Sequence, residues 1–318
     1  MDSFFLTLSM KQKIQSFLSS VMRAVSKLLI IFDTPLSLQD YEDMNTIVEL
    51  RTITYKKTLL FTICMIKSFY KASKISARCY IHIDNKLPWL DRALLRYHLP
   101  FAKLVEYINN PITNNSDINN FQHSFQGQKL MTCFNDCKAS KLLLIDSDIL
   151  FFERPSALLD WAKQGKACLF MEDTGSYVML SRGEFNHYFG IDRVKVNINT
   201  GILGLIKTQP LFNKSDLSHF VKSTTSIIND RRIPNYEAHY WKDNYILIEQ
   251  SAYIYFLSRA INSDPKFSFS VLSKDKYQLV ARTKFSDNPV AIHYAGESKD
   301  LMYEHYFYQR IKSLLKKI

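Results

Sequence analysis

The chain has 318 residues, of which 47% are hydrophobic and 22% charged, and its formal net charge is +11. This composition is that of a globular protein with a substantial core, and the 8 glycines and 9 prolines exclude a collagen-like or linker-rich chain. The charge suggests an anionic partner, which could be a nucleic acid, an acidic membrane surface or a phosphorylated substrate, but net charge alone does not exclude a generally basic protein without one.

The cysteines and the N-terminus bear on location. None of the five cysteines forms a C-x-x-C pair, so we expect core thiols in a reducing compartment. Lys11, Lys13, Arg23 and Lys27 interrupt the first apolar run, and no small-residue cleavage site follows, so we expect no signal peptide. The uncharged apolar runs are far shorter than the ~20 residues that span a bilayer. We therefore expect a cytoplasmic protein, either free or peripheral on the inner face of a membrane.

An N-terminal extension precedes the main fold. Apolar residues recur at helical spacing over residues 10–32, ahead of Pro35, which predicts an amphipathic helix. The apolar positions are Ile14, Phe17, Leu18, Val21, Met22, Val25, Leu28, Leu29 and Phe32. Such a helix either packs on the domain or lies on a membrane. We assign residues 1–40 to this extension.

From about residue 44, strands and helices alternate. We expect strands at 46–53, 79–84, 102–108 and 141–146, with helices at 56–73, 89–99 and 127–140. This alternation is typical of βαβ units and a mostly parallel α/β sheet. The apolar run ahead of Asp146 indicates a central strand covered on both faces. Asp146 then lies at the carboxyl end of that strand, where open α/β sheets bind ligands.

The second half is less regular. We expect a helix at 155–165, a strand at 167–173, and a strand at 193–207 with a turn at Asn199-Thr200-Gly201. Helices at 217–230 and 248–259 and a strand at 289–296 follow. A basic aromatic helix over 302–318 closes the chain, and it either packs on the domain or lies on an anionic membrane surface.

Two carboxylates separated by one residue point to a metal. Asp146 and Asp148 can ligate one hard cation, Mn²⁺ or Mg²⁺, where the chain leaves the strand. Such a cation can bridge two phosphates and stabilise a departing diphosphate. Asp-x-Asp alone is a common pattern, so its position at a strand end carries the prediction.

These residues resemble a known family. Asp146-Ser147-Asp148 resembles the DxD motif of GT-A-fold nucleotide-sugar glycosyltransferases, in particular the retaining glycogenin-like and lipopolysaccharide galactosyltransferase-like family. Asn199-Thr200-Gly201 resembles its F-N-[ST]-G segment, and Glu249-Gln250 its D-Q-x-x-x-N helix start. Residues 293–299 resemble its H-x-x-G-x-x-K segment. The resemblance spans roughly residues 44–300. It implies a single GT-A domain at 41–300 with helical extensions at 1–40 and 301–318.

The resemblance implies a metal and phosphate site. His293 would be the third metal ligand beside Asp146 and Asp148, although a lone histidine is often structural or solvated. Gly296 would let the backbone approach a phosphate. Lys299 would neutralise diphosphate charge, with an ordinary surface lysine as the alternative.

The resemblance also implies roles around the donor sugar. Asn199 would hydrogen-bond the sugar or the reacting centre with Gly201 making room, or the segment is an ordinary β-turn. Gln250 would face the β side of the sugar, and Glu249 would contact sugar hydroxyls or only complement the helix dipole. The other implied contacts are Lys129, Glu172, Asp173 and Thr200 for the donor, Ser147 for the ribose, and Thr54 and Tyr55 for the base, where Tyr55 is otherwise a core residue.

The expected function is metal-dependent transfer of a sugar, with retention, from a nucleotide diphosphate sugar (UDP-sugar favoured) to a hydroxyl of a glycan, glycolipid or protein. The chain departs from the family at Ile198, Glu249 and Asp300-Leu301, which bear on acceptor and stereochemistry more than on fold. The alternatives are an inverting enzyme with Glu249 as base, a nucleotidyltransferase, or a non-catalytic membrane-binding module. The sequence shows no nucleic-acid-binding signature, so we expect no nucleic-acid partner.

Overall fold

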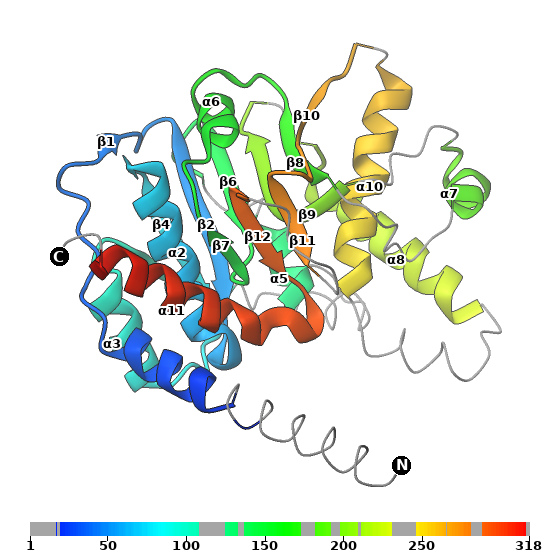
Figure 1. Ribbon diagram of the computed structural model, residues 1–318. Helices are drawn as coiled ribbons and strands as arrows, with labels where there is room; N and C mark the ends of the chain where they lie inside the picture. Colours follow the sequence, from blue (N-terminus) through cyan, green and yellow to red (C-terminus); the bar gives the residue numbers. More distant parts are fainter. Residues whose placement is uncertain are drawn as a thin grey trace, which may run out of the picture.

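A seven-stranded sheet forms the centre of the computed structural model, which describes residues 17, 20–107, 125–132, 137–172, 182–191, 198–208, 211–230, 246–264, 266–280 and 288–315 (Figure 1). The strand order is β10-β8-β9-β6-β2-β4-β5. The strands are β2 (Val48–Thr54), β4 (Arg78–Ile83), β5 (Lys103–Glu106), β6 (Lys141–Ile145), β8 (Cys168–Glu172), β9 (Ile198–Ile206) and β10 (Phe269–Leu272). β9 runs antiparallel to β6 and β8, and the other pairs are parallel. The predicted mixed, mostly parallel sheet is confirmed.

Helices cover both faces of this sheet (Figure 1). They are α2 (Leu59–Ser73, after the 3-10 turn η1 at Lys56–Thr58), α3 (Trp89–His98), α5 (Phe125–Thr132), α6 (Ser156–Gln164), α7 (Arg182–Phe189), α8 (Lys214–Asp230), α10 (Ile246–Ser263) and α11 (Lys299–Leu315, after the 3-10 turn η2 at Gly296–Ser298). Strand β6 shows why two cores result. Leu143 and Ile145 enter the core of α2, α6 and α11, whereas Leu142 and Leu144 enter the core of α8 and α10.

A second sheet lies beside the end of β6. It contains β11 (Tyr277–Val280), β12 (Ala291–Tyr294) and β7 (Ile149–Phe151), while β1 (Glu42–Asp43) pairs separately with β3 (Ile75–Ser76). β7 begins directly after Asp148, and β12 runs antiparallel to it with His293 opposite Ile149. This pairing carries the late strand β12 to the aspartates.

Two expectations about local structure are wrong. Asn199-Thr200-Gly201 is not a turn but part of continuous β9, where the register shifts so that residues 200–202 have no partner on β8. The expected helix at 127–140 is α5, which ends at Thr132, and residues 137–140 enter β6 without helix. Residues 133–136 and 192–197, which belong to these expected elements, lie outside the described residues.

The terminal helices lie side by side (Figure 1). A helix over residues 20–31 contacts α11 through an Arg23–Asp300 ion pair of 3.0 Å and through Lys27, whose ammonium lies 4.9 Å from the Tyr303 ring centroid. α11 in turn buries Tyr303 and its neighbours Met302 and Tyr306. Within the described part of the chain, no helix combines the length and the apolar character needed to cross a membrane. The domain boundaries at residues 40 and 300 stay predictions.

Candidate active site

The two aspartates are held by backbone hydrogen bonds at the carboxyl edge of the sheet. Asp146 directly follows β6, and its N–H donates to the carbonyl of Gly201 on β9 (2.8 Å). The carbonyl of Asp148 accepts from the N–H of Tyr294 on β12 (2.8 Å). The position of Asp146 at the end of a buried strand is as predicted, and the short turn that follows also connects the two sheets.

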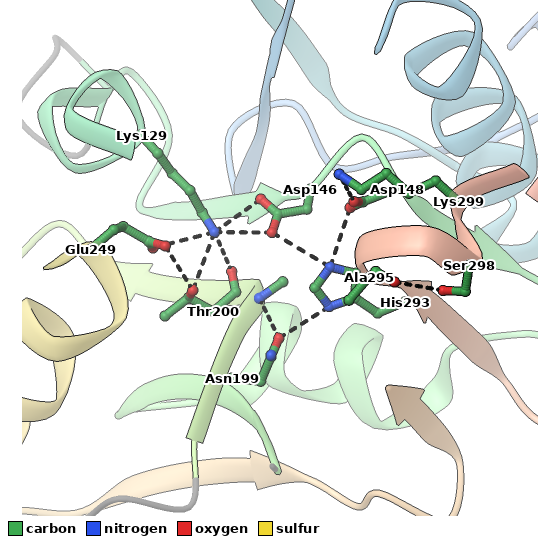
Figure 2. A network of polar contacts seen from close by, with 11 residues as sticks. Lys129, Asp146, Asp148, Asn199, Thr200, Glu249, His293, Ala295, Ser298 and Lys299 are labelled. Atoms are coloured by element: carbon green, nitrogen blue, oxygen red, sulfur yellow. Dashed lines mark hydrogen bonds and ion pairs between the residues drawn. The ribbon is translucent and has the colours of Figure 1, made fainter. Parts of the chain in front are cut away.

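His293 completes a cluster with both aspartates (Figure 2). Its Nε2 lies 3.2 Å from Asp148 Oδ1 and 3.8 Å from Asp146 Oδ2. One ligand atom from each of the three residues lies within 4.8 Å of the others. Two carboxylate oxygens and one imidazole nitrogen can ligate a divalent cation, so the three side chains predicted as ligands fit such an ion.

Asn199 orients the imidazole. Asn199 Oδ1 accepts a hydrogen bond from the Gly201 N–H (2.8 Å) and lies 3.2 Å from His293 Nδ1. With its proton on Nδ1, His293 donates to Asn199 and turns the lone pair of Nε2 toward the carboxylates. A Cβ at position 201 would lie 2.5 Å from His293 Nδ1, so Gly201 makes room for this ring. The roles toward a sugar that the resemblance implied for Asn199 and Gly201 stay predictions.

Lys129 links the aspartate turn to α10. Its buried ammonium lies 2.9 Å from Asp146 Oδ1 and 3.3 Å from Glu249 Oε1, and it donates to the Thr200 carbonyl (2.8 Å). Burial opposes the charge, but Asp146 and Glu249 outweigh it and raise the pKa of Lys129 above its usual value. Lys129 is thus a permanent cation between two carboxylates.

Glu249 is a buried carboxyl whose charge depends on pH near neutrality. Only 5% of it is exposed, and Thr200 Oγ1 donates to its Oε2 (3.1 Å). Its Oε1 has no well-directed hydrogen bond within the described residues, although Lys129 Nζ is 3.3 Å away. Burial raises the pKa of Glu249 to about 7, with Lys129 opposing the rise and Asp146 adding to it. Glu249 can therefore exchange a proton near neutral pH.

Lys299 faces the opposite side of the cluster. It begins α11, and its ammonium lies 2.7 Å from Asp148 Oδ2 while 37% of its side chain is exposed. Burial opposes ionisation of Asp148, but His293 and Lys299 hold the pKa of that carboxyl well below its usual range. Gly296, just upstream, has φ of +59°, a backbone conformation that favours glycine.

The other predicted contacts lie outside this network or are engaged elsewhere. Glu172 ends β8, two strands from β6, and pairs with Lys274 at 3.7 Å. Gln250 Nε2 donates to the carbonyl of Ile198 (3.0 Å).

The residues predicted to bind the nucleoside differ in how accessible they are. The hydroxyl of Thr54 is buried and accepts a hydrogen bond from the Thr62 hydroxyl (2.8 Å). Tyr55 is half-buried and is one of the groups that raise the pKa of Lys299. Ser147 is buried between the two aspartates. Asp173 lies outside the described residues.

The solved structures that match the chain agree on the fold. No family model matches the chain, and no curated protein sequence matches it. Among solved structures, the apo form of mouse xyloside xylosyltransferase 1 matches with a TM-score of 0.50 at 11% identity, over 80% of this chain and 99% of that one. The fold is that of glycosyltransferases. The galactosyltransferase LgtC, in complex with donor and acceptor sugar analogues, matches with a TM-score of 0.52 at 12% identity over 82% of this chain and 94% of LgtC.

One further match is to a longer protein. The bifunctional glycosyltransferase WbbM, in its apo structure, has a TM-score of 0.54 at 13% identity, over 84% of this chain and 50% of WbbM. The chain thus spans about half of WbbM. At these identities the matches show the fold and not the reaction.

Proposed function

We propose that the protein is a metal-dependent glycosyltransferase that moves a sugar from a nucleotide diphosphate sugar, with UDP-sugars favoured, to a hydroxyl of a glycan, glycolipid or protein. The observation that carries this proposal is the convergence of Asp146, Asp148, His293 and Lys299 at the carboxyl edge of a glycosyltransferase fold. Carboxylates alone would repel a diphosphate, so a site with this composition calls for a cation and a lysine.

Asp146, Asp148 and His293 would hold the cation, and Asn199 keeps the imidazole turned toward it. When bound, Mn²⁺ or Mg²⁺ supplies Lewis-acid stabilisation of the charge that develops on the leaving diphosphate. Lys299 is exposed enough to exchange Asp148 for a phosphate oxygen. Its ammonium, whose pKa is raised because Asp148 outweighs the effect of burial, would neutralise the same charge.

Glu249 favours retention over inversion in its present setting. Lys129 and Thr200 both contact its carboxylate, so it is better suited to accept a hydrogen bond from a sugar hydroxyl than to take the proton of an attacking acceptor hydroxyl, which inversion requires. In the retaining reaction the leaving phosphate oxygen takes the proton of the attacking acceptor hydroxyl. The inverting alternative has one observation in its favour, because a carboxyl with a pKa of about 7 is suited to general-base catalysis.

The experiment is a screen of nucleotide diphosphate sugars with Mn²⁺, with Mg²⁺ and with EDTA, following release of nucleoside diphosphate. We expect turnover with one donor class, lost in EDTA and in Asp148→Ala, and kept in Asp160→Ala, an exposed carboxylate on α6 that serves as the matched control. The proposal fails if no donor is bound or hydrolysed and Asp148→Ala changes nothing. Release of inorganic pyrophosphate would instead indicate a nucleotidyltransferase. The anomeric coupling of the product in proton NMR distinguishes retention from inversion.

A further inference from the structure

The helix over residues 20–31 carries most of its apolar side chains on the outside, whereas Ile30 is buried. Val21, Met22, Val25, Leu28, Leu29 and Phe32, here called the outer stripe, are 42%, 42%, 40%, 54%, 47% and 79% exposed. They follow the spacing of one helical face. A surface helix usually turns such a face toward the core, so this arrangement is the reverse of the ordinary one.

The polar face of the same helix is the one that contacts the protein. Ser26 and Ile30 are buried, Arg23 pairs with Asp300, and the ammonium of Lys27 lies over the Tyr303 ring. Rolling the helix to bury the outer stripe would break both cationic contacts. The stripe therefore stays outward in the folded protein.

Asp33, two residues after the helix, is anchored to the domain. Asp33 accepts a hydrogen bond from Lys67 on α2 (2.9 Å) and from the Tyr306 hydroxyl on α11 (3.2 Å), and it pairs with Arg310. Asp33 is 8% exposed, and Lys67 is fully buried. This buried ionic contact ties the end of the helix to two others, so the outer stripe is presented on a fixed support.

We propose that the outer stripe docks on the surface of an anionic lipid bilayer, with the helix in the plane of the headgroups. An amphipathic helix in this position buries its apolar face about 5–10 Å deep and gains from cationic groups nearby. The adjacent α11 exposes Tyr308 (67%), Leu315 (66%) and the basic Lys312. The chain as a whole carries a net charge of +11, which attracts an anionic surface.

The same charge argues against the other apolar occupant, a second copy of the chain. Two copies with a net charge of +11 each repel one another, whereas an anionic bilayer neutralises the charge. One helical face also offers little area compared with the ~800 Å² per partner of a standard protein interface. A bilayer has no such minimum, because each inserted apolar side chain adds its own contribution.

The test is sedimentation of the full chain with phosphatidylcholine vesicles, with and without phosphatidylglycerol. The variant is Leu28→Ser/Leu29→Ser/Phe32→Ser. The matched control is Tyr188→Ser/Val271→Ser, at positions 50% and 44% exposed on α7 and β10. We expect wild type and control to partition equally into anionic vesicles. We expect the stripe variant to lose at least tenfold, about 1.4 kcal/mol, and neutral vesicles to bind at least tenfold less.

A second measurement does not depend on the folding of the triple variant. Phe32→Trp keeps an aromatic side chain at the most exposed stripe position. Its fluorescence, as the difference from wild type, should shift to the blue with anionic vesicles.

The proposal is overturned if wild type does not sediment with anionic vesicles, or if the stripe variant binds as wild type does. Equal binding to neutral vesicles, an unshifted spectrum, or a stripe-dependent dimer without vesicle binding would overturn it as well. No donor or metal enters these assays, so their outcome is independent of the proposed sugar transfer.

Discussion

His293 Nε2 lies 3.2 Å from Asp148 Oδ1, so the late strand β12 and the turn after β6 share one ligand cluster. Removal of either side chain should therefore remove one predicted ligand from the same metal site. We expect His293→Ala and Asp148→Asn each to weaken Mn²⁺ binding at least tenfold, measured by titration followed by electron paramagnetic resonance. The exposed His187 on α7 is the matched control, and His187→Ala should bind Mn²⁺ as wild type does. Equal Mn²⁺ affinity in all four proteins would contradict the assignment.

Gly201→Ala should damage the metal site through packing. The new Cβ would lie 2.5 Å from His293 Nδ1 and 2.9 Å from Asn199 Oδ1, so the imidazole has to move. We expect a loss of roughly 1–3 kcal/mol of folding free energy, typical of overpacking, and at least tenfold weaker Mn²⁺ binding.

Gly204→Ala on the same strand provides the comparison, because its Cβ would meet Trp161 Cζ2 at 2.5 Å, away from His293. It should cost similar stability and leave the Mn²⁺ affinity unchanged. Equal effects of both variants on Mn²⁺ binding would contradict a specific role of Gly201 in making room for the imidazole.

Glu249 should make the metal-free protein less stable as the pH rises. Burial raises its pKa in the folded state to about 7, above the ordinary value of 4.5. Below pH 4.5 the carboxyl is neutral in both the folded and the unfolded state, so it does not lower the free energy of unfolding. Between pH 4.5 and 7 it ionises freely only in the unfolded state, which favours unfolding. Above pH 7 this destabilisation has reached its full value. One pH unit of pKa difference corresponds to about 1.4 kcal/mol, so the cost approaches about 3 kcal/mol.

Glu249→Gln removes this ionisation and should flatten the dependence. The measurement is urea unfolding in EDTA at pH 5, 6, 7 and 8, with Glu153→Gln, an exposed carboxylate shortly after β7, as control. Parallel pH profiles of wild type and Glu249→Gln would rule out the burial argument.

The buried contacts of Asp33 should contribute more to the free energy of unfolding than the Arg23–Asp300 ion pair on the surface. Burial raises the pKa of Asp33, but Lys67 and Arg310 outweigh it and leave that pKa below its usual range. Burial also lowers the pKa of Lys67, and Asp33 only partly offsets this effect. The charged form of Lys67 is therefore less stable in the folded protein than in water, even beside Asp33. Asp33→Asn would leave that ammonium without its anion, which typically costs about 3–5 kcal/mol.

Asp300→Asn provides the comparison, because the Arg23–Asp300 pair is 31% and 49% exposed. Surface pairs of this kind contribute about 0–1 kcal/mol. Thermal unfolding should therefore separate the two variants clearly, and hydrogen exchange of residues 20–31 should rise in Asp33→Asn. Similar stabilities of the two variants would show that burial of the Asp33 contact has no consequence.

The strand and helix alternation was readable because each element carries its own hydrophobic period. The apolar residues ahead of Asp146 predicted the buried strand β6, and the position of two carboxylates at its end predicted a site at the sheet edge. β7 was not predicted, because three apolar residues can form many structures and only pairing with β12 makes them a strand. Asn199 to Gly201 looked like a turn, since Asn and Gly favour turns locally, but the pairing of Asn199 with Met171 on β8 and the hydrogen bond from the Asp146 N–H to the Gly201 carbonyl keep them in β9.

Local pattern therefore determined most of the strands and helices, where the carboxylates emerge, and that residues 21–32 have an apolar face. Periodicity identifies two faces of a helix but not which one meets the domain. Only the tertiary structure decided that Arg23 and Lys27 point inward, because Asp300 and Tyr303, their partners on α11, are more than 250 residues away. Leu28 and Phe32 point outward as a consequence. The same holds for Lys129 between Asp146 and Glu249, since a contact between distant segments depends on how the sheet and helices pack, which no local spacing encodes.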